Sequence, residues 1–169
     1  MTLQDLQTMV DYHYWARDRM LDALEPLDAD AYNRNLGGSF RSIRETATHI
    51  YAAEWAWYRR WRGDSPTALL AADRFADLAE LRRAWTELEA QVREFVAGLG
   101  DGGVSRILEY KLLSGQAGAS PMWQMVQHVV NHASYHRGQI TTMLRQIGAQ
   151  PPKPLDMIAY YRIQSAGAR

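Results

Sequence analysis

Cysteine is absent from this chain of 169 residues, which excludes disulfide bonds and metal sites built on thiolates. A metal site must therefore use nitrogen and oxygen ligands. Net charge is absent as well, because 19 basic residues balance 19 acidic residues and neither sign forms a long run. This balance gives no electrostatic basis for binding a nucleic acid or an anionic membrane surface.

The chain also lacks long hydrophobic runs. No stretch approaches the roughly 20 apolar residues that a membrane-spanning helix needs. Residues 1–5 lack the basic and apolar blocks of a signal peptide, so we expect a cytoplasmic protein without a membrane partner. The length is typical of a single domain, which would span residues 1–169.

Apolar residues recur at helical spacing in four segments. These segments are residues 2–25, 42–62, 77–98 and 120–148. Capping residues mark the first three starts at Thr2, Ser42 and Asp77, each with an acidic residue three positions later. The fourth start is predicted at Ser120, with Pro121 as the first helical residue.

The connections carry weaker signals. Residues 33–39 are expected to form a loop, residues 104–113 a short extended segment, and the tail at residues 156–161 is expected to pack back on the helices. Four long amphipathic helices joined by connections of roughly 10–20 residues predict an all-α fold. We expect a four-helix bundle with a long crossover connection, in which inward side chains of facing helices can build a metal site.

The most informative motif is a run of three histidines, His128, His132 and His136, spaced four apart inside the fourth helix. Residues four apart lie on one helix face, so two neutral imidazoles can share a divalent ion. All three cannot bind one ion, because His128 and His136 are eight residues apart, about 12 Å along the axis. Spacing alone does not decide which neighbouring pair binds.

A third ligand must come from His13 or His49, the two remaining histidines. His49 shares its helix face with apolar positions, whereas His13 lies on a mixed face. We therefore predict a three-nitrogen site of His49, His132 and His136, with open positions as in a catalytic metal site. The alternative is that these are core histidines satisfied by ordinary hydrogen bonds.

Several segments resemble the DinB family of damage-inducible proteins. The similar segments are residues 12–16, 42–50, 128–140 and 156–161, with Gly148, Pro151 and Pro152. The resemblance covers nearly the whole chain and implies a four-helix bundle with a long crossover, commonly a homodimer, with a divalent metal on three histidines. It assigns these ligands to His49, His132 and His136 and leaves His128 outside the set.

The wider superfamily, as the resemblance implies, includes YfiT-like metal-dependent hydrolases and thiol transferases that use bacillithiol or mycothiol. We therefore expect an enzyme acting on a small-molecule substrate, either a hydrolase or a transferase that activates a low-molecular-weight thiol. Without cysteine, any thiol must be a cosubstrate. Three histidines suit zinc, nickel, iron or manganese.

Catalytic candidates near the predicted site are Tyr135, Arg137 and Glu54, with Glu45 and Tyr12 as further acid–base candidates. Arg137 can bind a substrate carboxylate or pair with an acidic residue between helices. A second hypothesis is a non-catalytic metal-binding module of a stress response. A DNA-binding repair factor is disfavoured, because no basic helix face stands out.

Overall fold

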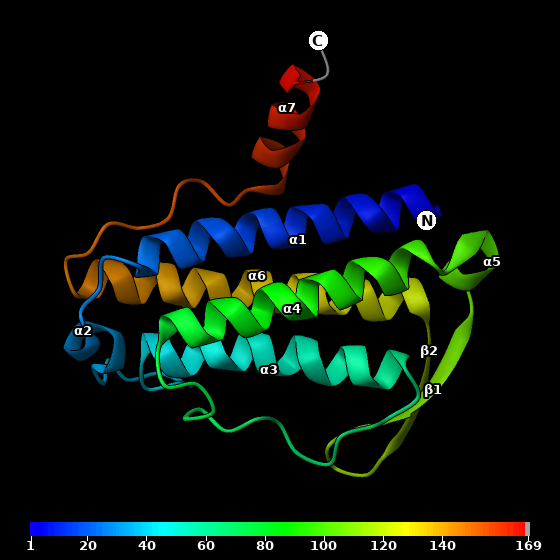
Figure 1. The fold of residues 1–169 in the computed structure, drawn as a ribbon, viewed down its shortest axis with the longest axis horizontal. Helices are drawn as coiled ribbons and strands as arrows, with labels where there is room; N and C mark the ends of the chain where they lie inside the picture. The colour runs from blue at the N-terminus through cyan, green and yellow to red at the C-terminus, as the bar shows by residue number, and fades with distance from the viewer. Residues whose placement is uncertain (168–169) are drawn as a thin grey trace.

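Four long helices lie side by side in the computed structural model, which describes residues 1–167 (Figure 1). They are α1 (Leu3–Leu24), α3 (Ile43–Trp61), α4 (Leu78–Ala97) and α6 (Met122–Gln146). Helix α3 packs against α4 and α6, and α1 packs against the same two helices. The helices α3 and α4 run in the same direction, so residues 62–77 return along the length of α3 as a long crossover (Figure 1).

The starts of three long helices follow the capping signals in the sequence. The Thr2 side chain accepts the Asp5 N–H, and the Asp5 carboxylate accepts the Thr2 N–H at 2.8 Å. Ser42 caps α3 and Asp77 caps α4 in the same way, each accepting an N–H three residues ahead. Each such cap contributes about 1 kcal/mol to the stability of its helix.

The predicted start of the fourth helix is wrong by one residue, because a β-hairpin precedes it. Strands β1 (Ile107–Lys111) and β2 (Ala117–Pro121) pair antiparallel. Ser120 lies in β2, where its Oγ is 3.2 Å from the Tyr110 hydroxyl, and Pro121 is the N-cap of α6. The hairpin also corrects the all-α expectation: the fold is mostly helical with one small sheet.

Three further helices were not predicted. They are α2 (Ala29–Asn33), α5 (Gly100–Val104) and α7 (Met157–Gly167). Helix α2 follows an Asp28 cap that accepts the Ala31 N–H at 2.7 Å. The expectation that the tail packs back on the helices holds only for its beginning. Buried Tyr160, in the first turn of α7, contacts the rings of Tyr12 and Trp15, whereas the rest of α7 projects away from the long helices (Figure 1).

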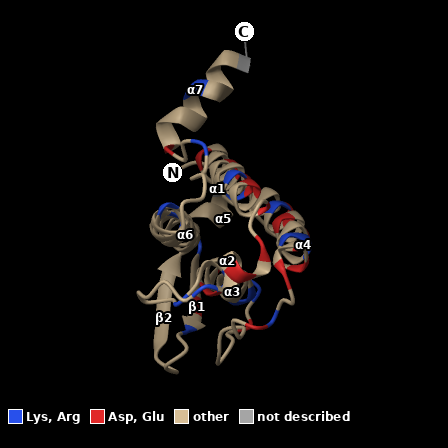
Figure 2. Ribbon diagram, turned by 90° about the vertical axis from the view of Figure 1, so that its left-hand side faces the viewer, with Lys and Arg blue, Asp and Glu red and all other residues tan. Residues whose placement is uncertain are grey.

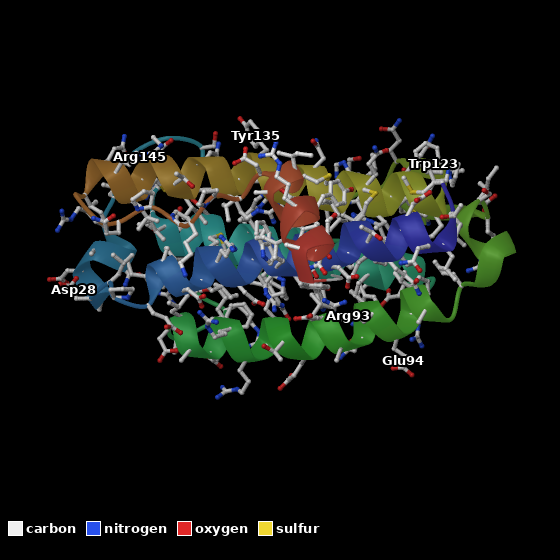
Figure 3. The ribbon with its side chains drawn as sticks, turned by 90° about the horizontal axis from the view of Figure 1, so that it is seen from above. Asp28, Arg93, Glu94, Trp123, Tyr135 and Arg145 are labelled. Atoms are coloured by element: carbon white, nitrogen blue, oxygen red, sulfur yellow. The ribbon has the colours of Figure 1, made fainter. Side chains whose placement is uncertain are left out.

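The core lies between the four long helices, where side chains fill the space that the ribbons leave (Figure 3). Acidic and basic residues are interspersed along α1 and α4 (Figure 2). Within residues 1–167, no helix has both the length and the apolar character needed to cross a membrane.

Candidate metal centre

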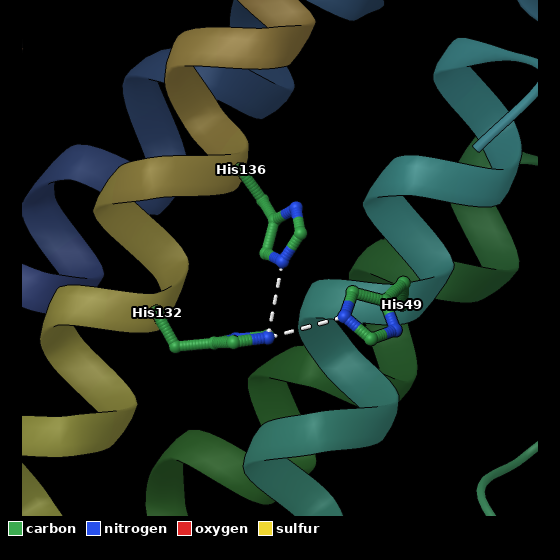
Figure 4. Close-up of side chains that lie close together, drawn as sticks. All are labelled: His49, His132 and His136. Atoms are coloured by element: carbon green, nitrogen blue, oxygen red, sulfur yellow. Dashed lines mark hydrogen bonds between the residues drawn. The ribbon is translucent and has the colours of Figure 1, made fainter. Parts of the chain in front are cut away.

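Three imidazoles meet where α3 packs against α6. His49 Nε2 lies 3.1 Å from His132 Nε2, although 83 residues separate the two in sequence, and His136 Nε2 lies 3.1 Å from the same atom (Figure 4). The three ligand atoms all lie within 4.8 Å of one another. The structure therefore brings together the three histidines that the sequence selects.

The donor set fits a metal ion better than it fits hydrogen bonding. A neutral imidazole Nε2 carries either a proton or a lone pair, so His132 Nε2 can hydrogen-bond to only one of its two neighbours at a time. A divalent ion accepts a lone pair from all three nitrogens. Tetrahedral bonds of about 2.0–2.1 Å place such nitrogens about 3.3 Å apart, which is close to the observed 3.1 Å.

A hydrogen bond donated to Gln139 sets the orientation of one imidazole. His136 Nδ1 lies 2.7 Å from Gln139 Oε1, and an amide oxygen only accepts. The proton therefore resides on Nδ1, and the lone pair of His136 Nε2 faces the other two histidines. Metal-binding histidines characteristically have such an outer hydrogen bond, which fixes the tautomer of the ligand.

Aromatic rings cover the cluster. The Phe40 ring stacks on His49 with centroids 4.2 Å apart, and the Tyr135 ring meets His136 edge-on at 5.1 Å. Burial, reinforced by His136, lowers the pKa of His49 to about 4. Burial, and then the neighbouring imidazoles, lower the pKa of His132 to about 3. Both residues are therefore neutral at pH 7, which is the form that binds a metal.

A cavity of about 380 Å³ adjoins this cluster. It lies between residues 36–40 and one face of α6, and Phe40, Tyr135 and Gln139 connect its wall to the imidazoles. None of its lining side chains carries a formal charge at neutral pH. Gly37 and Gly38 have φ values of 78° and 91°, so the loop follows a backbone path that favours glycine.

The other two histidines lie outside the cluster. His128 contacts the Trp57 ring edge-on at 5.1 Å, and its own ring lies 5.9 Å from that of His132. His13 is buried with its Nε2 2.9 Å from Glu54 Oε2. Within residues 1–167, the three histidines that lie close enough together to hold one metal ion are therefore His49, His132 and His136.

Among the catalytic candidates, Tyr135 alone is in contact with a cluster histidine. It is 66% exposed and projects outward from α6 (Figure 3). The Glu54 carboxylate is buried and accepts from the Tyr14 hydroxyl at 2.6 Å and from Trp85 Nε1 at 2.7 Å. Burial alone would raise the pKa of Glu54, but His13 and these hydrogen bonds lower it below its usual range.

The remaining three candidates have structural contacts elsewhere. Arg137 is buried beside the Tyr12 ring on α1. The Tyr12 hydroxyl donates to the Leu155 carbonyl, and Glu45 accepts the Arg41 N–H near the start of α3. These contacts give none of the three an interaction with the imidazole cluster.

Two residues of the centre were missed in the sequence. Gln139 lies one turn after His136, so its position was a usable signal for a hydrogen bond along the helix. Phe40 lies in the loop before α3, and nothing in the sequence indicates that its ring stacks on His49.

Comparisons with known proteins cover nearly the whole chain. Residues 1–166 match the DinB family. The chain is 26% identical over 151 residues to Protein DinB of Bacillus subtilis (strain 168). The aligned region covers 83% of this chain and 84% of that protein. It also resembles the crystal structure of a DinB-like protein from Bacillus cereus ATCC 10987, with a TM-score of 0.61 and 15% identity over 86% of this chain and 95% of the other. The latter similarity concerns the fold alone.

Proposed function

The chain belongs to the DinB family, and on that premise we propose that it binds one divalent metal ion through His49, His132 and His136. We further propose that it uses this ion in an enzymatic reaction on a small-molecule substrate. The observation that carries the proposal is the convergence of three Nε2 atoms, two of them 3.1 Å from the third, beside a cavity. Zinc, nickel, iron and manganese all suit this donor set.

Three neutral imidazoles leave a divalent ion its full charge, so the ion supplies Lewis acidity that lowers the pKa of a water or thiol bound to it. The chain's own residues prepare the site for this chemistry. Gln139 holds the His136 tautomer, and Phe40 shields the His49 ring from water on one side. These contacts fix the ligands before an ion arrives, which favours tight binding.

The lining of the adjoining cavity favours the binding of an uncharged substrate group. Its lining offers aromatic surface from Phe40 and Tyr135 and the neutral amides of Gln139 and Gln146. Tyr135 has the only ionisable side chain in that lining, so its hydroxyl is the candidate proton donor, while the hydroxyls of Ser39 and Thr142 can also hydrogen-bond to a substrate. A charged group at this position would have no counter-ion from the protein, which disfavours its binding.

The proposed reaction is either transfer of a substrate group to a low-molecular-weight thiol or hydrolysis. A thiol would have to be a cosubstrate, because the chain has no cysteine. The alternative function is a non-catalytic metal-binding module. One feature supports it. The three histidines come from two different helices, so a bound ion would crosslink α3 and α6 and stabilise the fold.

Chelation separates these possibilities. The metal-loaded protein is assayed with neutral aromatic esters, and with neutral electrophiles plus a panel of low-molecular-weight thiols, before and after EDTA treatment. We expect turnover to disappear with the metal and to return on its addition, while circular dichroism shows that the helices persist. A His128→Ala variant serves as the control, because His128 is outside the ligand set. No turnover with any substrate, together with melting on chelation, would favour the structural module.

A further inference from the structure

Arg137 is a buried cation whose hydrogen bonds are incomplete. Its side chain is 2% exposed, and its Nη2 donates to Ser134 Oγ at 2.8 Å. Its Nε and Nη1 atoms are buried and have no hydrogen-bond partner among the described residues. A guanidinium keeps its charge in proteins, so Arg137 leaves two charged donors without an acceptor, a costly arrangement in a protein interior.

The surroundings of Arg137 offset this charge only in part. The Tyr12 ring lies 5.8 Å from Arg137 Cζ, within range of a cation–π interaction. The field of the buried Glu54 carboxylate also favours the cation. That carboxylate is already bound to His13, Tyr14 and Trp85, and no salt bridge to Arg137 is present in the part of the chain that the structure describes.

Arg137 lies at the wall of a second cavity, with a volume of about 560 Å³. Ser134, which accepts the hydrogen bond from Arg137, and Tyr12, whose ring lies beside the guanidinium, line the same cavity. Residues 152–157 of the C-terminal segment also line it. This segment runs back over α1 (Figure 1) and is held there by the hydrogen bond from the Tyr12 hydroxyl to the Leu155 carbonyl. The cavity therefore lies among α1, α6 and the segment before α7.

Positive charge dominates this wall. Arg137, Arg145 and Lys153 line the cavity, and Asp156 is the one carboxylate among the lining residues described. The cavity beside the histidine cluster has no formally charged lining side chain. Since consecutive residues of a helix are about 100° apart around its axis, Arg137 and the cluster ligand His136 face different neighbours, α1 and α3.

We propose that this second cavity binds a small organic molecule through an oxyanion, either a carboxylate or a phosphate. The exposed side chains of Arg145 and Lys153 bind the oxyanion, and the buried charge of Arg137 strengthens the field in which it lies. The site is separate from the histidine cluster and does not depend on a bound metal. Its ligand stabilises the folded protein, because the cavity that binds it exists only in the folded state.

The test measures thermal unfolding of the protein with inorganic phosphate, phenyl phosphate and benzoate, and with benzamide as the neutral control, at constant ionic strength. Arg137→Gln alters the core and can unfold the protein, so the variant used is Arg145→Gln with Lys153→Gln. Its matched control is Arg83→Gln with Arg106→Gln, which removes the same charge from exposed positions that do not line the cavity. His132→Ala distinguishes this site from a metal centre that binds phosphate.

We expect a saturable rise in Tm with phenyl phosphate or benzoate, and none with benzamide. The apparent Kd should weaken on the order of tenfold in the Arg145 and Lys153 variant, and should not change in the control variant or in His132→Ala. A response to benzoate identifies a carboxylate ligand, and a response to the phosphates alone identifies a phosphate ligand. No saturable rise with any anion, or equal affinity in both double variants, would overturn the proposal.

Discussion

Gln139 Oε1 lies 2.7 Å from His136 Nδ1, one helical turn away on α6. This hydrogen bond places the single N–H proton of the neutral His136 ring on Nδ1, away from the cluster. It thereby connects a residue outside the ligand set to the lone pair that a metal would use.

Replacing Gln139 by Leu should weaken metal binding 10–100-fold, the range typical of losing an outer hydrogen bond to a ligand. The fold should be retained, because the side chain is partly exposed. Competition titration against a chromophoric chelator measures the change. Gln146→Leu is the matched control, since Gln146 lines the same cavity without contacting the cluster. Equal affinity in the two variants would mean that the hydrogen bond has no role in binding.

His49→Ala should remove most of the bound metal, whereas His128→Ala should leave it in place. His49 Nε2 lies 3.1 Å from His132 Nε2, within the cluster, whereas the His128 ring contacts the Trp57 ring outside it. Elemental analysis of both purified variants measures the metal per chain. Equal losses in the two would contradict the assignment of ligands.

The metal-free protein should lose stability as the pH falls from neutrality. Unfolded histidine has a pKa of about 6.5, whereas His49 and His132 have pKa values of about 4 and about 3 in the fold. The unfolded state therefore binds more protons below about pH 6.5, so the free energy of unfolding decreases from there until the pH passes the folded values. Urea unfolding at a series of pH values measures this decrease.

A His49→Gln, His132→Gln double variant should show a flatter pH dependence over the same interval, because it lacks both titrating groups. An identical slope in the variant and the parent protein would show that other groups cause the acid destabilisation.

Glu54→Gln should destabilise the fold by about 3 kcal/mol without reducing the metal content. The carboxylate is fully buried among His13, Tyr14 and Trp85, and breaking a buried charged network of this kind typically costs this much. Chemical denaturation and elemental analysis report the two effects separately. Loss of metal at unchanged stability would instead place Glu54 in the metal centre.

The homodimer that the family resemblance implies stays a prediction. Helix α7 projects from the body (Figure 1). Its side chains Ile158, Tyr161 and Ile163 are exposed, and apolar surface of this kind mediates association. Light scattering should show a dimer that the Ile158→Glu, Ile163→Glu variant reduces to a monomer. A parent protein that is monomeric at all concentrations tested would contradict this prediction.

Local signals in the sequence predicted most of the secondary structure and the cluster. Thr2, Ser42 and Asp77 cap their helices as expected, because capping depends only on residues within one turn. The four-residue spacing and the apolar surroundings of His49 favoured a site on α3 and α6, whereas the choice of His132 and His136 over His128 and His132 depended on the resemblance to the DinB family. The start of α6 was predicted wrongly because strand pairing, a longer-range interaction, holds Ser120 in β2.

Side-chain directions were harder to predict than positions. Arg137 follows His136 directly but lies against Tyr12, and Glu54 shares α3 with His49 but contacts α1 and α4. In both cases the rotation around the helix between two positions determines the direction of each side chain. Which helix lies in that direction depends on how the helices are packed. The stacking of Phe40 on His49 depends on a loop path and had no local signal.

The zinc K-edge X-ray absorption spectrum of the protein loaded with one equivalent of zinc tests the central claim most directly. The predicted spectrum has three imidazole nitrogens at about 2.0–2.1 Å in the first coordination sphere, with the remaining positions occupied by oxygen ligands. A first sphere containing one imidazole or none, in a protein that retains its helices, would contradict a centre formed by His49, His132 and His136.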